Sequence, residues 1–168
     1  LSVFERANTP REQPTEYPPG DYYQVVILGL GRLGTAIATR LGNKGIKVLG
    51  LDFNPSVIKR CRSLGLDIEY GDITDADFVA ELPLGRAHWI VSTIPQHHTG
   101  LTFEDIIKTI VQITRPTGFT GQFAATSQSK AETEELERLG VDLVLEPFQD
   151  AADRATELLL EGIESRSE

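Results

Sequence analysis

The sequence has almost no cysteine and no methionine at all. Cys61 is the only cysteine among 168 residues, so no disulfide can form within the chain. Such usage is typical of cytosolic rather than secreted proteins. Cys61 shares a helical face with Val57, Ile58 and Leu64, so we interpret it as a small buried hydrophobe in preference to a redox sensor. Because even the first residue, Leu1, is not methionine, we expect the chain to be a segment of a longer protein.

Long apolar runs and clusters of basic residues are also missing. No stretch approaches the roughly 18 apolar residues of a membrane-spanning helix, and no signal-peptide pattern opens the chain, so we expect a soluble protein. Lys and Arg number 16 against 25 Asp and Glu, which gives a formal net charge of −9. A surface of that sign repels phosphate backbones, and nucleic acid is therefore not an expected partner.

What remains is the composition of one globular domain. Hydrophobic residues make up 40% and charged residues 24% of the chain, outside the range of disordered proteins. Residues 1–20 are different, because they contain four prolines among polar residues without apolar periodicity. We predict a linker or tail over 1–20, one folded domain over 21–164 and a short tail over 165–168.

Within that domain, short β-branched runs alternate with stretches of helical periodicity. This alternation is typical of a parallel sheet with helices on both faces. The predicted strands are 25–28, 47–51, 67–70, 88–93, 122–126 and 142–145. The predicted helices are 33–44, 55–64, 74–82 with Thr74 as its cap, 103–114, 130–139 and one that follows Pro147. We therefore predict an α/β, Rossmann-like fold with a doubly wound parallel six-stranded sheet in the order 3-2-1-4-5-6.

A glycine-rich loop, residues 29–34 with the sequence GLGRLG, follows the first strand and opens the first helix. Gly29 permits a sharp turn, Gly31 lets a pyrophosphate approach the backbone, and Gly34 lets the helix pack on the strand. Asp52 ends the second strand, where it can accept hydrogen bonds from ribose hydroxyls. The pattern predicts a dinucleotide site, with the phosphates at the positive end of the helix. In the alternative interpretation, these residues serve only as a turn and a cap.

Other candidate ligand-binding residues lie at the same edge of the predicted sheet. Arg32 either reaches a phosphate or is simply solvated. Asp72 either accepts from an adenine amino group or stabilises its own loop. The full set of candidate cofactor-binding residues is Gly29, Gly31, Arg32, Leu33, Gly34, Asp52, Phe53, Asp72, Ile73, Ser92, Thr93 and Ile94. Because the Asp52 carboxylate opposes a 2′-phosphate, NAD(H) is favoured over NADP, while AMP, ADP or ATP remain possible ligands.

No pattern for catalysis or metal binding accompanies this loop. His97 and His98 follow the fourth strand, but adjacent histidines point in different directions and lack metal-ligand spacing, so a loop role is favoured over proton transfer. His88, at a strand entrance, is interpreted as a packing or surface residue. No Ser-His-Asp pattern, paired-carboxylate motif or P-loop is present. We therefore expect no catalytic residues, no metal site and no enzyme activity.

Three segments carry a resemblance to a known family: residues 24–34, the Leu51–Pro55 turn with its DFNP sequence, and the Tyr70–Asp75 segment with its GDITD sequence. Over roughly residues 22–160 the chain resembles the N-lobe of RCK (TrkA-N) domains. The resemblance implies a cytosolic domain that regulates potassium channels, potassium uptake systems or cation:proton antiporters. Residues 124–129 differ from many members, which place a nucleotide-contacting arginine there.

Residues 1–6 and 9–12 are similar to the linker after the last membrane helix in glutathione-gated efflux antiporters of the monovalent cation:proton antiporter-2 superfamily. This similarity implies an attached membrane transporter domain and a location at the cytoplasmic face of a membrane. The last predicted helix, about 151–163, has Ala155, Leu158, Leu159 and Ile163 on one stripe, which can cover its own sheet or meet a partner. The resemblance implies a crossing to a second subunit, so we expect a homodimer.

Three hypotheses for function follow. The favoured one is a regulatory domain that binds NAD(H) or an adenine nucleotide and gates potassium or sodium/proton transport. The second is a fragment of an NAD-dependent oxidoreductase, which needs a substrate domain that the four residues after position 164 cannot supply. The third is a stand-alone redox-sensing subunit that assembles on a separate membrane protein.

Overall fold

A single parallel sheet organises the molecule. The computed structural model describes residues 22–95 and 103–166. All neighbouring strands are parallel, and their order, β3-β2-β1-β4-β5-β6, confirms the predicted one. The strands are β1 (Val25–Leu28), β2 (Val48–Asp52), β3 (Asp67–Tyr70), β4 (Trp89–Ser92), β5 (Gln122–Thr126) and β6 (Leu143–Leu145).

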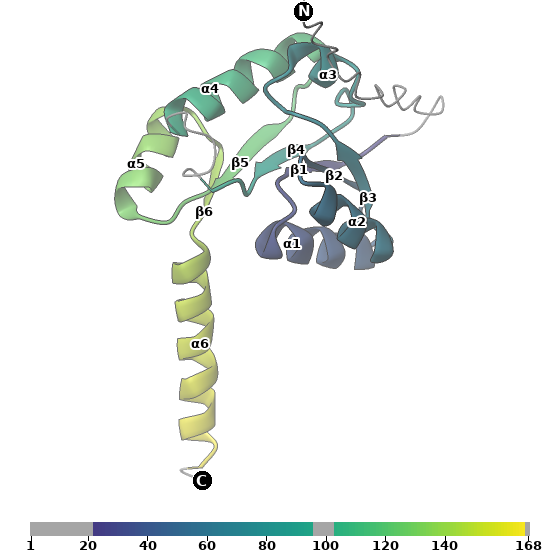
Figure 1. Cartoon of the computed structure of the whole chain (residues 1–168). Helices are drawn as coiled ribbons and strands as arrows, with labels where there is room; N and C mark the ends of the chain where they lie inside the picture. Colours follow the sequence, from purple (N-terminus) through teal and green to yellow (C-terminus); the bar gives the residue numbers. More distant parts are fainter. Residues whose placement is uncertain (1–21, 96–102, 167–168) are drawn as a thin grey trace, which may run out of the picture.

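Helices cover both faces of this sheet, as the alternating pattern predicted. Figure 1 shows α1 and α2 together on one side and α3 and α4 on the other. The helices are α1 (Arg32–Asn43), α2 (Pro55–Ser63), α3 (Ala76–Ala80), α4 (Phe103–Thr114), α5 (Lys130–Arg138) and α6 (Pro147–Glu164), with a 3₁₀ turn η2 (Arg115–Thr117) after α4.

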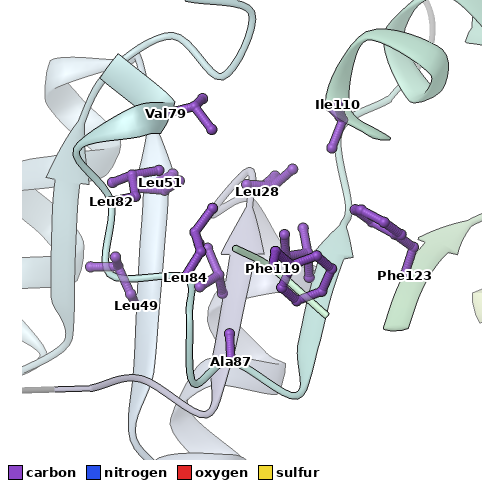
Figure 2. Close-up of a cluster of buried hydrophobic side chains, with 12 residues drawn as sticks. Leu28, Leu49, Leu51, Val79, Leu82, Leu84, Ala87, Ile110, Phe119 and Phe123 are labelled. Atoms are coloured by element: carbon purple, nitrogen blue, oxygen red, sulfur yellow. The ribbon is translucent and has the colours of Figure 1, made fainter. Parts of the chain in front are cut away.

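Two hydrophobic clusters lie on opposite faces of the sheet because successive side chains of a strand alternate. In β1, Val26 and Leu28 belong to the cluster beneath α3 and α4, whereas Val25 and Ile27 belong to the cluster beneath α1 and α2. All four are buried, which explains why a central strand has an uninterrupted apolar sequence. Figure 2 shows the first cluster, with Leu28, Leu49, Leu51, Val79, Leu82, Leu84, Ala87, Ile110, Phe119 and Phe123 labelled.

The cap of α3 is a correction to the sequence analysis. Asp75, not Thr74, is the N-cap residue, and its side chain accepts hydrogen bonds from the backbone N–H groups of Asp77 and Phe78. Thr74 instead donates from both its N–H and its hydroxyl to Asp72 Oδ1. Both residue types cap helices well, so the choice depends on where the chain turns, which local sequence does not determine.

Helix α6 is exposed from Phe148 onward. It projects away from the sheet in Figure 1, and none of its residues is buried. Phe148, Leu159 and Ile163 are 71%, 69% and 62% exposed. Of the two interpretations of its apolar stripe, covering its own sheet is therefore wrong in this structure. In contrast, Cys61 is fully buried, as predicted.

Some of the sequence-based expectations concern residues outside the described ranges, and others can be compared with the structure. Residues 1–20 and the pair His97 and His98 lie outside them. His88 is exposed at the entrance of β4, which confirms a surface position. Over 22–95 and 103–166, no helix is both long and apolar enough to cross a membrane.

Candidate nucleotide-binding site

The glycine loop joins the end of β1 to the start of α1. Gly29 has φ +87°, a conformation that side-chain-bearing residues rarely adopt. Gly31 is the N-cap residue, has no side chain with which to cap, and accepts the first bond of α1 from the Thr35 N–H. The N–H groups at positions 32–34, between Gly31 and Thr35, have no hydrogen-bond partner within the described ranges. They form a set of free donors at the positive end of a helix, which suits a phosphate.

The three glycines serve different purposes in this loop. A Cβ at Gly34 would collide with the Gly29 carbonyl oxygen and lie 2.8 Å from Thr93 Oγ1, so this position requires glycine for packing. A Cβ at Gly29 would lie 3.0 Å from Ile94 Cγ1. A Cβ at Gly31, however, would meet nothing within 4 Å. The space beside Gly31 is therefore open, as the close approach of a pyrophosphate requires.

The Leu30 peptide holds the loop in place from both sides. Its N–H donates to Asp52 Oδ2 at 2.8 Å, and its carbonyl oxygen accepts from Thr35 Oγ1 at 2.9 Å and from Arg60 Nη2 at 2.8 Å. The Leu30 side chain is 1% exposed and packs against the backbone of Gly50. Sequence reasoning missed Thr35 and Arg60, since neither belongs to the glycine motif. The loop is thus preorganised before any ligand arrives.

Asp52 lies where the sequence placed it, at the end of β2 and beside the glycine loop. Besides the Leu30 N–H, its carboxylate accepts a hydrogen bond from the Asn54 N–H at Oδ1, at 2.9 Å. An ionised carboxylate offers about four acceptor sites, so sites remain for two ribose hydroxyls. Asp52 therefore combines a structural role, which was not predicted, with a position suited to the predicted one.

The ends of β2 and β3 at this edge carry Asp72 and two exposed aromatic residues. Asp72 is exposed, and its Oδ1 is engaged by Thr74, which is the loop-stabilising role considered from the sequence. Phe53 is 58% exposed, and Ile73 packs at the rim of the core cluster beneath α3. Tyr70, which was not predicted, is 50% exposed and pairs in register with Asp52. An aromatic residue at a strand end was the signal that could have identified it.

The end of β4 contacts the glycine loop directly. Thr93 donates from its hydroxyl to the Gly29 carbonyl oxygen at 2.6 Å and from its N–H to the Leu28 carbonyl oxygen at 2.9 Å. Ile94 contacts the Gly29 position, as described above. Ser92 differs, because its side chain is only 6% exposed and lines a small internal cavity beneath α4. The structure therefore brings Thr93 and Ile94, but not the Ser92 hydroxyl, to the exposed edge.

Two loop side chains extend outward from α1. Arg32 is exposed and makes no hydrogen bond or ion pair with another described residue, so both of its interpretations, on a phosphate or in solvent, remain open. Leu33 is 36% exposed. Across the described part of the chain, no group of three or more His, Cys, Asp or Glu side chains could hold a metal ion. The arrangement at this edge can bind phosphates, ribose and an aromatic base.

Several solved structures have a similar fold. The TrkA-N domain of the inner membrane protein ybaL from Escherichia coli has a TM-score of 0.66 at 18% identity and covers 83% of this chain and 98% of that one. The Kef CTD of Shewanella denitrificans in its AMP-bound form has a TM-score of 0.59 at 23% identity, with 81% and 78% covered. The GsuK channel bound to NAD has a TM-score of 0.62 at 17% identity, with 77% and 22% covered.

Sequence comparison finds similarity to a potassium-efflux protein. The glutathione-regulated potassium-efflux system protein KefC of Salmonella arizonae is 27% identical over 109 residues, which cover 65% of this chain and 18% of KefC. This chain thus spans only about a fifth of the length of that relative. The model of the TrkA-N domain matches residues 25–147, well over half of the chain. The resemblance found in the sequence is confirmed, and the chain belongs to the TrkA-N domain family.

Proposed function

We propose that this chain is a regulatory domain that binds NAD(H) or an adenine nucleotide and thereby controls the transport of potassium, or of another monovalent cation, by a membrane protein. The observation that carries this proposal is the combination of free N–H donors at the start of α1, open space beside Gly31 and the Asp52 carboxylate at the next strand end. Membership of the TrkA-N family and similarity to KefC, a potassium-efflux protein, support the regulatory role.

The ligand would lie across the carboxyl edge of β2, β1 and β4. Its phosphates would accept from the N–H groups of Arg32, Leu33 and Gly34, and its ribose would donate to Asp52. The adenine would lie near Phe53, with the second half of a dinucleotide near Thr93 and Ile94. The similar structures with bound NAD, ADP and AMP support this class of ligand. A ribose hydroxyl suits the acidic Asp52 better than a 2′-phosphate does.

We further propose that binding occurs without turnover. A dehydrogenase needs a group that transfers a proton beside the nicotinamide. Among the described residues at the ends of β4 and β5, the hydroxyls of Thr93 and Ser127 are both engaged in hydrogen bonds with the protein. The family supports the same conclusion, because KefC, to which this chain is similar, is a transport protein.

Two partners belong to the proposal. One is a membrane transporter domain at whose cytoplasmic face this domain lies, as in a KefC-like protein. The other is a second copy of the chain, joined through α6. The apolar residues that α6 exposes would be buried in such a dimer; they are Phe148, Leu158, Leu159, Leu160 and Ile163. Monomeric proteins rarely leave an apolar surface of this kind in contact with water.

Calorimetric titration with NAD, NADH, NADPH, AMP, ADP and ATP tests the proposal. We expect saturable binding of NAD(H) or an adenine nucleotide, weaker binding of NADPH, and no consumption of NADH with time. Asp52→Asn should lower the affinity, whereas the neighbouring surface change Lys59→Gln should leave it unchanged. If none of the six nucleotides binds to a folded domain, the proposed ligand class is wrong.

A further inference from the structure

The amino edge of the sheet lies opposite the proposed nucleotide site. The segments that lead into β1, β2 and β4 are neighbours there, because Gln24 donates from its N–H to the Lys47 carbonyl oxygen and accepts from the His88 N–H at its own carbonyl oxygen. The helix between two parallel strands runs from the carboxyl edge back to the amino edge. The carboxyl-terminal ends of α1 and α2 therefore lie at this edge as well.

This edge is basic, although the whole chain has a formal net charge of −9. Among the described residues, two exposed carboxylates lie along it from β3 to β5, Asp67 and Glu81, and Asp67 accepts a hydrogen bond from the Tyr23 hydroxyl. Six exposed Lys and Arg side chains lie along the same stretch, at the ends of α1, α2 and α4 and before β2 and β4. We call these six the basic edge: Arg40, Lys44, Lys47, Arg62, Arg86 and Arg115.

The helix ends explain only part of the basic edge. Cations near the carboxyl end of a helix offset the negative end of its dipole, which accounts for Arg40 and Arg62. Lys47 and Arg86 lie outside helices and share the ring of Tyr22, with Arg86 Cζ 4.0 Å and Lys47 Nζ 5.3 Å from its centroid. A cation on an aromatic face keeps its charge. Tyr22 therefore holds two like charges together beside the start of β1.

The carboxyl edge has the opposite sign. Asp52 ends β2, and Asp72, Asp75 and Asp77 are exposed after the end of β3. Because the two edges differ in sign, a negatively charged surface attracts the amino edge and repels the carboxyl edge. The cations of the basic edge come from several segments spread along the sheet, so they fit an extended anionic surface better than a single small anion.

We propose that the basic edge docks on a membrane surface that contains anionic phospholipids. Residues 1–21 precede Tyr22, so the N-terminal part of the chain joins the domain at this edge. In the proposed function this part leads to a membrane transporter domain, and the inference rests on the proposed function in this respect alone. Each basic side chain close to an anionic membrane strengthens binding by about fivefold. Docking in this orientation leaves the glycine loop and Asp52 facing away from the membrane, open to a nucleotide.

Sedimentation of the 168-residue chain with lipid vesicles tests the proposal. Vesicles of phosphatidylcholine alone are compared with vesicles in which about one third of the lipid is phosphatidylglycerol. We expect the chain to bind the anionic vesicles only. Binding should be lost as the salt concentration rises, because salt screens exposed charges.

Lys44→Gln combined with Lys47→Gln removes two charges from the basic edge. We expect this pair to lower the partition coefficient on anionic vesicles by more than about tenfold. Lys59→Gln combined with Lys130→Gln is the matched control, because it changes the net charge equally at exposed sites within α2 and at the start of α5. The control pair should change the partition coefficient by less than about threefold, since charges far from the membrane are screened.

Lysine acetylation followed by mass spectrometry gives a second readout on the unmodified protein, independent of whether the variants fold. The reaction rates of Lys44 and Lys47 are compared with those of Lys59 and Lys130, with and without anionic vesicles. We expect the vesicles to slow the reaction of the first pair only.

The outcomes separate this proposal from the proposed function. A chain that does not sediment with anionic vesicles at low salt would overturn the docking proposal, and another acidic surface, such as that of a protein, would then be the occupant to seek. Equal losses in the two variant pairs, or equal protection of all four lysines, would also overturn it. Calorimetry with nucleotides reports on the opposite edge. If the vesicles bind but no nucleotide does, the proposed ligand class fails and the basic edge keeps its role.

Discussion

The glycine-loop region and helix α6 are held in opposite ways. In the loop, the peptide of a single residue, Leu30, bonds to three side chains from β2, α1 and α2 and packs its own side chain in the core. Helix α6 has no buried residue over its whole length and begins at one small cluster of hydrogen bonds. The loop where a ligand is proposed to bind is therefore tied to three elements, whereas the helix where a partner is proposed to bind is exposed to solvent. Four changes test this contrast, in order of decreasing effect on the free energy of unfolding.

The largest effect is expected from Gly34→Ala. The new methyl group would collide with the Gly29 carbonyl oxygen, a backbone atom that cannot move without disturbing β1. Overpacking of this kind should lower the free energy of unfolding by about 3 kcal/mol, measured by urea denaturation. Gly31→Ala is the matched control, because its methyl group meets no protein atom. We expect Gly31→Ala to cost less than about 1 kcal/mol of stability while it weakens nucleotide binding. Equal destabilisation by both changes would contradict the different roles assigned to the two glycines.

Asp52→Ala should have the next largest effect. It leaves the Leu30 N–H without its acceptor, so the free energy of unfolding should fall by about 1–3 kcal/mol. Nucleotide affinity should fall by a similar amount, about 1–3 kcal/mol, through the lost ribose hydrogen bonds. Denaturation and calorimetry on the same preparation measure the two effects. A loss of stability with unchanged affinity would leave Asp52 only its structural role.

Arg60→Ala is expected to be milder. It removes one of the two donors to the Leu30 carbonyl oxygen, while the Thr35 hydroxyl remains. We expect a loss of about 1 kcal/mol in stability and a lower nucleotide affinity, since the loop is less well ordered. Lys59→Ala, the exposed neighbour on α2, serves as the control. If Arg60→Ala matched this control in both measurements, the Arg60 bond would not contribute to preorganising the loop.

The smallest effect on folding is expected from Leu159→Glu combined with Ile163→Glu. Both side chains are more than half exposed, so the free energy of unfolding of one chain should change by no more than about 0.5 kcal/mol per substitution. The proposed dimer should nevertheless dissociate, because each copy would bring two charges into its apolar contact. Light scattering after size-exclusion chromatography measures the mass. A dimer that survives both substitutions would place the interface elsewhere.

Much of the fold could be predicted because it depends on local periodicity. The β1, β3 and β5 ranges match the predicted strands, and the strand order follows from regular alternation of strands and helices. The glycine motif and Asp52 were found for a similar reason, since each lies at a fixed distance from a strand end. The Asp75 cap, the η2 turn and the buried Ser92 side chain were not predicted, because sequence periodicity does not determine the direction of a chain at the end of an element.

The sequence by itself determined the order of elements, the glycine loop and the acidic residue at the second strand end, because these features arise from spacings within a short stretch of chain. Only the tertiary structure decided that Asp52 and Arg60 hold Leu30, since those pairs are 22 and 30 residues apart. It also decided that α6 extends away from the sheet with none of its residues buried. An apolar stripe shows that a helix has a face to bury, but where that face is buried depends on which surfaces the folded chain leaves open.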